Sequence, residues 1–146
     1  MRMPTSRGFT LLEVILSFVL MSIIVAIGIP LYESSFTHNE LAIAEYTVTH
    51  AFRRAVSLAK ASDGDSPWGV FIQPENIVIF QGTSYITRNA PADELFSIAK
   101  SITPSGTTEF VFSKFTGSPQ LTGSVTLTTD AGQIKTISVN AKGMVQ

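Results

Sequence analysis

The hydrophobic and polar positions predict a helical N-terminal part followed by a strand-forming part. Residues 9–29 form an apolar run whose polar members are Thr10, Glu13, Ser17 and Ser22. As a helix, this run would span roughly 30 Å, which is the thickness of the hydrocarbon core of a bilayer. We therefore predict a transmembrane helix over residues 9–29.

Residues 30–61 continue the helical pattern with a different distribution of polar side chains. Apolar residues recur there at steps of three and four, which places them on one face of a helix. This face consists of Leu41, Ala44, Val48, Phe52, Ala55 and Ala59. The pattern predicts an amphipathic helix that packs on a sheet.

From residue 62 onward the period changes to that of strands, and we predict a β-rich head over 62–146. Two apolar runs, 68–72 and 77–80, flank the turn residues QPEN and predict a hairpin. The runs SVTLTT and IKTISV predict a second hairpin around DAGQ, with further strands near 95–98 and 108–113. The buried side of the second hairpin is predicted to hold Val125, Leu127, Ile134, Ile137 and Val139.

Composition narrows the possible chemistry. The chain has no cysteine, so it has no disulfide framework, thiolate metal site or cysteine nucleophile. Hydrophobic residues make up 45% and charged residues 14%, with a formal net charge of −1. A polyanion-binding protein usually shows a basic patch or stripe. The sequence shows no such patch beyond the pair Arg53-Arg54.

The charges around the apolar run predict its orientation. Arg2 and Arg7 precede it, whereas the first charged residues after it are acidic, Glu33 and Glu40. Because basic flanks stay in the cytoplasm, we expect a single-pass protein of the inner membrane with a cytoplasmic N-terminus and an exported head. Glu13 conflicts with an ordinary span, since a charge at that depth is costly.

Three interpretations of this segment compete. A cleaved secretory signal has a shorter apolar core and a small-residue cleavage site after it, and neither is present. A plain signal anchor fits the length and the orientation but leaves Glu13 unexplained. The third interpretation places a cut before the apolar run, between Gly8 and Phe9.

The stretch RGFTLLEVILSFVLMSIIVAIGIP resembles the class III prepilin signal of type IV pilins and type II secretion pseudopilins. In that family a basic leader ends in Gly, the mature chain begins with Phe, Glu is its fifth residue and Pro follows about twenty residues in. Gly8, Phe9, Glu13 and Pro30 occupy these places. The resemblance makes residues 1–8 a leader peptide, residues 9–29 the helix of the filament core and Phe9 the site of N-methylation.

The resemblance also implies the partners and the role of Glu13. Prepilin peptidase would process the chain, and an inner-membrane assembly platform would join it to other pilin or pseudopilin subunits. Glu13 would pair with the N-terminal amine of a neighbouring subunit, which sets register between apolar helices. Pro30 removes one backbone donor and can kink the helix.

The head resembles that of H-type minor pseudopilins and FimT-like pilins, in which two packed β-sheets follow the long helix. The matching features include Arg88, Asn89 and Asp93, and a loose match over residues 142–145. The expected fold is therefore α+β, with a long N-terminal helix packed on two small antiparallel sheets.

Other candidate chemistry is weak. Asp63 and Asp65 alternate in a loop, yet they are too few for a calcium cage, and we predict a turn. His38 and His50 do not have the spacing of a helical ligand pair, and neighbouring Asp93 and Glu94 would face opposite sides of a strand. We expect no enzyme activity, metal or cofactor.

The leading hypothesis is a structural subunit, minor rather than major, of a pilus or secretion pseudopilus. The alternative is a FimT-like pilin that captures DNA. Phosphate contact needs clustered cations, and Arg88, Lys100, Lys114, Lys135 and Lys142 are scattered in sequence, so nucleic acid is not the expected partner. A membrane-anchored enzyme or sensor is the third hypothesis.

Overall fold

The structure, a computed structural model, describes residues 8–146, except for the side chains of residues 27–38. Apart from Gly8, the predicted leader lies outside the described residues, and so do the side chains of Pro30 and His38. The chain divides into two compact units, with the boundary between Phe36 and Thr37.

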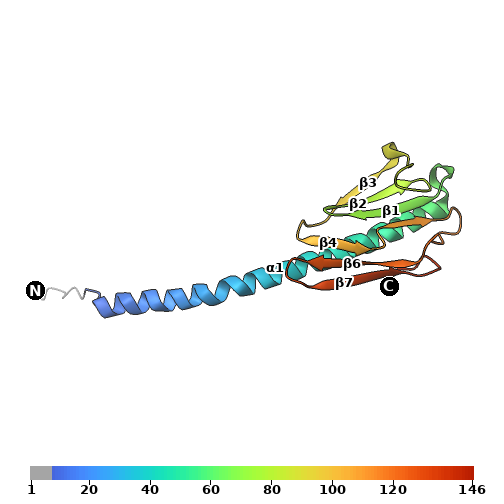
Figure 1. Cartoon of the computed structure of the whole chain (residues 1–146). Coiled ribbons are helices and arrows are strands. Elements are labelled where there is room, and N and C mark those ends of the chain that lie inside the picture. The colour runs from blue at the N-terminus through green and yellow to red at the C-terminus, as the bar shows by residue number, and fades with distance from the viewer. Residues whose placement is uncertain (1–7) are drawn as a thin grey trace, which may run out of the picture. The chain divides into compact units, whose positions relative to one another are not determined.

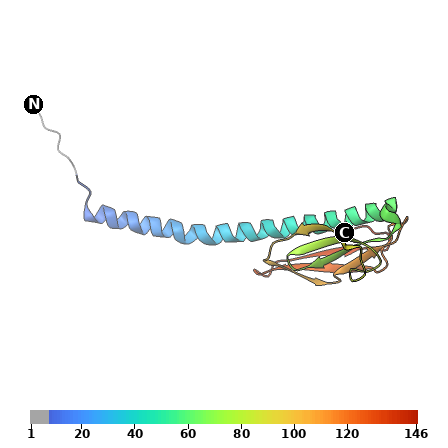
Figure 2. The same ribbon diagram turned by 90° about the horizontal axis from the view of Figure 1, so that it is seen from above.

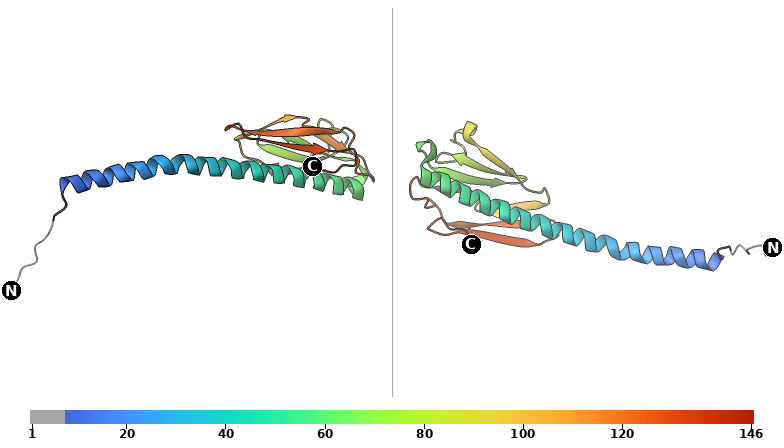
Figure 3. Two further views of the ribbon diagram at one scale, coloured as in Figure 1. Left: turned by 90° about the horizontal axis from the view of Figure 1, so that it is seen from below. Right: turned by 180° about the vertical axis from the view of Figure 1, so that it is seen from behind.

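Helix α1 spans Leu11–Ala61 and contributes to both units (Figure 1). In the second unit its apolar stripe is buried as predicted, from Leu41 at 3% exposure to Ala59 at 0%. Both sheets of this unit lie on the same side of α1 (Figures 2 and 3). The helix stripe therefore forms one wall of the core.

The first sheet has four antiparallel strands in the order β3-β2-β1-β5. They are β1 (Trp68–Gln73), β2 (Asn76–Gln81), β3 (Glu94–Ser97) and β5 (Glu109–Phe112). The predicted hairpin is confirmed, since β1 and β2 pair from Trp68 opposite Gln81 to Gln73 opposite Asn76. The strands predicted near 95–98 and 108–113 are confirmed as β3 and β5. Short 3₁₀ turns occur at Asp63–Asp65 and Ala90–Ala92.

The second sheet has the order β4-β6-β7, with β4 (Ile102–Gly106), β6 (Gly123–Thr129) and β7 (Ile134–Val139). The predicted hairpin of β6 and β7 is confirmed. The prediction that Ile134 is buried is wrong, because its side chain is 61% exposed. Side chains alternate along a strand, and Ile137 and Val139 take the inner face, so Ile134 belongs to the outer one.

The sequence analysis missed strand β4. Its residues ITPSG lack a strand-like apolar pattern, and Pro104 cannot donate to a sheet ladder. The strand is tolerated because β4 lies at the edge of its sheet, where Pro104 is opposite Leu127 of β6.

One core joins α1 to both sheets within the second unit. The ring of Phe52 on α1 packs edge-to-face on Phe110, with the ring centres 5.0 Å apart, and on Phe112 at 6.3 Å. Val125 and Leu127 bring the second sheet into the same cluster. The predicted α+β fold, a helix followed by a head with two antiparallel sheets, is thereby confirmed.

Candidate functional site

The predicted processing junction lies just before α1. Residues 8–10 have no regular secondary structure, and α1 begins at Leu11. Phe9 is 82% exposed, and no atom lies close to the position that a side chain on Gly8 would occupy. Exposed, non-helical backbone is where proteolytic cleavage concentrates. The bond between Gly8 and Phe9 is therefore sterically open to a peptidase.

Thr10 caps the start of the helix. The backbone N–H of Glu13 donates to the side-chain oxygen of Thr10 at 3.3 Å, and that of Val14 donates to the backbone carbonyl of Thr10 at 3.2 Å. The spacing Thr-x-x-Glu is that of a capping box, in which a hydroxyl satisfies one free N–H of the first turn. The sequence analysis did not identify Thr10, although this spacing is visible in TLLE.

Glu13 lies in the first turn of α1 and is exposed. A carboxylate at this position interacts favourably with the positive end of the helix dipole. In the part of the chain that the structure describes, no cation pairs with the Glu13 carboxylate.

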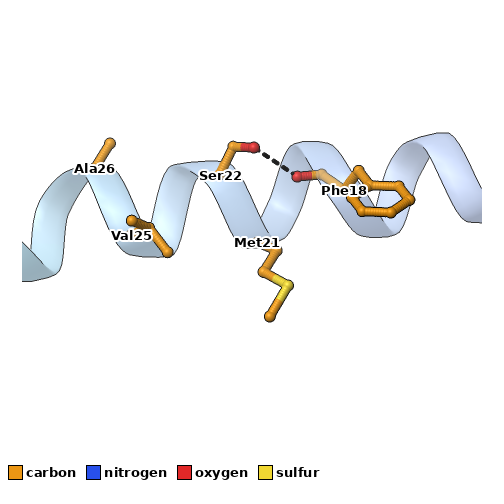
Figure 4. Close-up of a pocket in the computed structure, with 5 residues that line it drawn as sticks. All are labelled: Phe18, Met21, Ser22, Val25 and Ala26. Carbon is orange, nitrogen blue, oxygen red and sulfur yellow. Dashed lines mark hydrogen bonds between the residues drawn. The ribbon is translucent and has the colours of Figure 1, made fainter.

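The apolar part of α1 presents its side chains outward over residues 11–26. Leu11, Leu12 and Phe18 are 79%, 77% and 68% exposed. An open hollow on this helix is lined by Phe18, Met21, Ser22, Val25 and Ala26 (Figure 4). Side chains of a single helix cannot enclose a ligand, so this hollow is part of an exposed, mainly apolar surface.

The two serines of this segment satisfy their hydroxyls internally. Ser17 donates to the carbonyl of Glu13 at 2.7 Å, and Ser22 donates to the carbonyl of Phe18 at 2.8 Å (Figure 4). Such bonds to the preceding turn are the usual arrangement of Ser in an apolar helix surface. The helix therefore offers its surroundings few polar groups that need a partner.

Among the side chains that the structure describes, no helix is long and apolar enough to cross a membrane. The predicted span over residues 9–29 thus stays a prediction.

The acidic residues that the sequence analysis singled out pair with separate cations in the head. Arg88 donates to Asp93 at 2.7 Å and lies over the ring of Tyr85 at 3.8 Å, whereas Arg54 donates to Glu94 at 2.9 Å. The hydrogen bonds to their carboxylates raise the pKa of both arginines above its ordinary value. Asp93 and Glu94 therefore do not converge on one site.

The remaining candidates take structural positions. Asp65 of the predicted turn pairs with Lys114, and the backbone carbonyl of Asp63 accepts the indole N–H of Trp68 at 2.9 Å. His50 lies between the rings of Tyr46 and Phe96. Over the described residues, no group of three or more possible ligands is placed to hold a metal ion.

Comparison with known proteins bears on the N-terminal segment. Residues 3–29 match the family model described as the prokaryotic N-terminal methylation motif. This motif is the class III prepilin signal of type IV pilins and pseudopilins, so the resemblance of the N-terminal segment to that signal is confirmed, while Pro30 lies just outside the matched residues. The H-type resemblance of the head is not confirmed. No curated protein and no solved structure matches the chain.

The match covers the N-terminal segment and does not extend into the head. It supports a pilin-like or pseudopilin subunit that prepilin peptidase processes and that assembles with other pilin subunits. The family that carries it is structural rather than enzymatic.

Proposed function

We propose that this chain is a structural subunit, of the minor class, of a type IV pilus or type II secretion pseudopilus. The observation that carries this proposal is the methylation motif over residues 3–29, which includes an apolar stretch of helix with outward-facing side chains. The preference for a minor subunit rests on the resemblance of the head to H-type pseudopilins.

Prepilin peptidase cleaves between Gly8 and Phe9 and methylates the new amine of Phe9. Support for this step comes from the motif and from the exposed, non-helical backbone at the junction. Methylation leaves the amine basic, so the mature chain begins with a positive charge beside an apolar helix.

Glu13 pairs with the N-terminal amine of a neighbouring subunit as the helix enters the filament. A carboxylate or an ammonium left alone in an apolar environment is penalised by several kcal/mol, whereas a paired arrangement is tolerated. Glu13 has the exposure that such a contact requires. The pair sets the axial register of helices whose remaining surface is apolar. Pro30 allows a kink further along the helix, because it lacks a backbone N–H donor.

Before assembly the chain resides in the inner membrane as a single-pass protein with its N-terminus in the cytoplasm. This topology is supported by Arg2 and Arg7 ahead of the apolar run and by the acidic residues after it. The head then faces the periplasm or the exterior, and the inner-membrane assembly platform adds the subunit to a filament.

A DNA-capturing pilin is the second candidate. Arg53, Lys60 and Lys142 have no ion-pair partner among the described residues, which favours an anionic partner of some kind. Against nucleic acid, Lys100, Lys114 and Lys135 are engaged by Glu75, Asp65 and Glu45. Nucleic-acid binding that declines with salt would support this candidate.

The decisive experiment is intact mass and N-terminal sequencing of the full chain produced with and without a prepilin peptidase. The expected product begins at Phe9 and carries one added methyl group on its amine, and it forms only when the peptidase is present. A chain that keeps residues 1–8, or that is cut after Ile29, would contradict the proposal.

A further inference from the structure

The positive side chains of the head fall into two groups. Those in ion pairs are Arg54, Arg88, Lys100, Lys114 and Lys135. Those without an ion-pair partner in the described part of the chain are Arg53, Lys60 and Lys142. Among the described residues, the positive side chains outside ion pairs are therefore confined to these three.

Two of these cations line one groove, and the third adjoins it. The groove is formed by Arg53, Val56, Lys60, Gly143, Met144 and Val145. Arg53 and Lys60 are seven residues apart on α1, so they lie on one face two turns apart. Lys142 precedes the C-terminal segment that forms the opposite wall. We call this feature the basic groove.

The walls of the basic groove are held by local bonds. The side chain of Asn140 accepts the N–H groups of Lys142 and Met144, both at 3.0 Å. Gly143 has φ +73°, and a Cβ on it would lie 2.4 Å from the carbonyl oxygen of Gly117. This close approach seats the C-terminal segment beside α1 and keeps the groove formed without a ligand.

The lining of the basic groove favours a ligand that carries both a negative charge and an apolar group. Met144 is 52% exposed beside Val56 and Val145, so the cations flank an apolar surface. Nucleic acid is bound through a longer series of cations along a stripe, whereas a short carboxylate-bearing protein segment with an apolar side chain matches both features.

The same head carries such a segment, the turn between β6 and β7. Asp130 is exposed and no cation pairs with it among the described residues, and four positions later Ile134 is 61% exposed. No atom lies within 4 Å of the position of a Cβ on Gly132, so the turn projects into open space. We call residues 130–134 the acidic turn.

The acidic turn cannot fill the basic groove of its own chain. The N–H of Asp130 donates to the carbonyl of Ser101 at 3.1 Å, and the hydroxyl of Ser101 donates to Glu40 at 2.6 Å, which places the turn near Glu40 on α1. From Glu40 to Arg53 and Lys60, the helix rises by roughly 20 to 30 Å. Any contact between the two must therefore join two copies.

We propose that the basic groove of one copy of this chain binds the acidic turn of a second copy. Asp130 of the second copy lies between Arg53 and Lys60, and Ile134 covers Met144. Because groove and turn are different surfaces, the contact is head-to-tail and repeats along an axis. This inference rests on the proposed function, since assembly into a filament is what would bring the heads of successive copies together.

The test uses disulfide cross-linking of the full chain in membranes that contain its peptidase and assembly machinery. The chain has no cysteine, so a chain carrying both Ile134→Cys and Met144→Cys, at the two positions proposed to touch, reports the proposed contact. We expect a ladder of cross-linked products from this variant. Two chains that carry one substitution each should give only dimers when mixed, and neither should cross-link alone.

Charge reversal on the same cysteine background tests the chemistry of the contact. Lys60→Glu or Asp130→Lys alone should lower the cross-linked fraction about tenfold, since like charges then meet at the contact. Both together should restore part of it, because the exchanged charges attract again while Arg53 is unchanged. The matched control combines Lys60→Glu with Thr83→Lys and Thr87→Lys on an exposed loop, which restores net charge but not the contact, and it should stay low.

The outcomes separate this inference from the proposed function. Chains that are not cut at Phe9 would overturn the proposed function. Chains that are cut at Phe9 and assembled but do not cross-link would overturn the head-to-tail contact alone. Recovery of cross-linking in the matched control would do the same, because that control restores net charge without restoring the contact. Salt-sensitive DNA binding by the full chain in detergent that is lost in Lys60→Glu, with no cross-linking, would assign the groove to nucleic acid instead.

Discussion

The backbone N–H of Glu13 is bonded to the hydroxyl of Thr10, three residues earlier in the chain. Thr10 therefore begins the helix at the position where the proposed mature chain has its second residue. This bond fixes the first turn of α1, and with it the direction in which the Glu13 carboxylate leaves the helix. The cap and the proposed assembly residue thus belong to one local structure.

Replacing Thr10 should loosen the first turn without affecting the remainder of the helix. For Thr10→Val, which keeps the shape and removes the hydroxyl, we expect a loss of about 1 kcal/mol of local stability. Faster hydrogen exchange of the amides of Glu13 and Val14 would register this loss. Thr10→Ser is the control and should exchange like the parent chain; equal protection in all three would argue against the cap.

Replacing Glu13 by Gln should separate processing from assembly. The amide keeps the size of the side chain but carries no charge for a neighbour's amine, so Glu13→Gln should be cut at Phe9 yet be largely absent from filaments. Quantifying the subunit in sheared filaments and in membranes checks this. Normal incorporation of the Glu13→Gln variant into filaments would contradict the proposed pairing of Glu13 with a neighbour's amine.

Two glycines with similar backbone angles, Gly143 in the basic groove and Gly132 in the acidic turn, provide a matched pair. Gly132 and Gly143 have φ +78° and +73°, but only at Gly143 would a Cβ meet a backbone oxygen, at 2.4 Å. Gly132→Ala should destabilise the head by about 1 kcal/mol through backbone strain alone. Gly143→Ala should cost clearly more, because the C-terminal segment must move, and denaturant unfolding compares the two. Equal losses would mean that the segment is not held against Gly117.

Two arginine ion pairs should differ in their importance for stability. The side chain of Asp93 is 10% exposed beside Arg88, whereas Arg54 and Glu94 are 47% and 34% exposed. Arg88→Ala leaves a nearly buried carboxylate without its partner and should cost about 1–3 kcal/mol of unfolding free energy. Arg54→Ala should cost less than about 1 kcal/mol, as exposed pairs do. A larger loss for Arg54→Ala would reverse this ranking.

The sequence predicted the parts of the fold whose residues carry a periodic signal. The helix stripe from Leu41 to Ala59 and the hairpin of β1 and β2 follow from spacing alone, because burial on one face sets both periods. Ile134 was misassigned because an apolar residue was counted without regard to the alternation that Ile137 and Val139 set. Strand β4 carries no such signal, and its pairing with β6 holds it in the sheet.

For the candidate sites too, the sequence revealed what a local motif carries and missed what tertiary folding brings together. Gly8, Phe9, Glu13 and Pro30 are read from a local motif, so the segment could be found without a structure. The basic groove could not, because Arg53 and Lys60 come together with residues 143–145 only through tertiary folding. Which cations remain free of ion pairs also depends on distant partners, such as Glu45 for Lys135.

The hydroxyls of Ser17 and Ser22 are bonded to carbonyls of their own helix rather than to any outside group. Such a helix can exchange one apolar neighbour for another, lipid chains for the helices of a filament, without breaking a polar contact at these positions. At Ser17 and Ser22, a change of apolar surroundings therefore carries no cost in broken hydrogen bonds, whichever way the change runs.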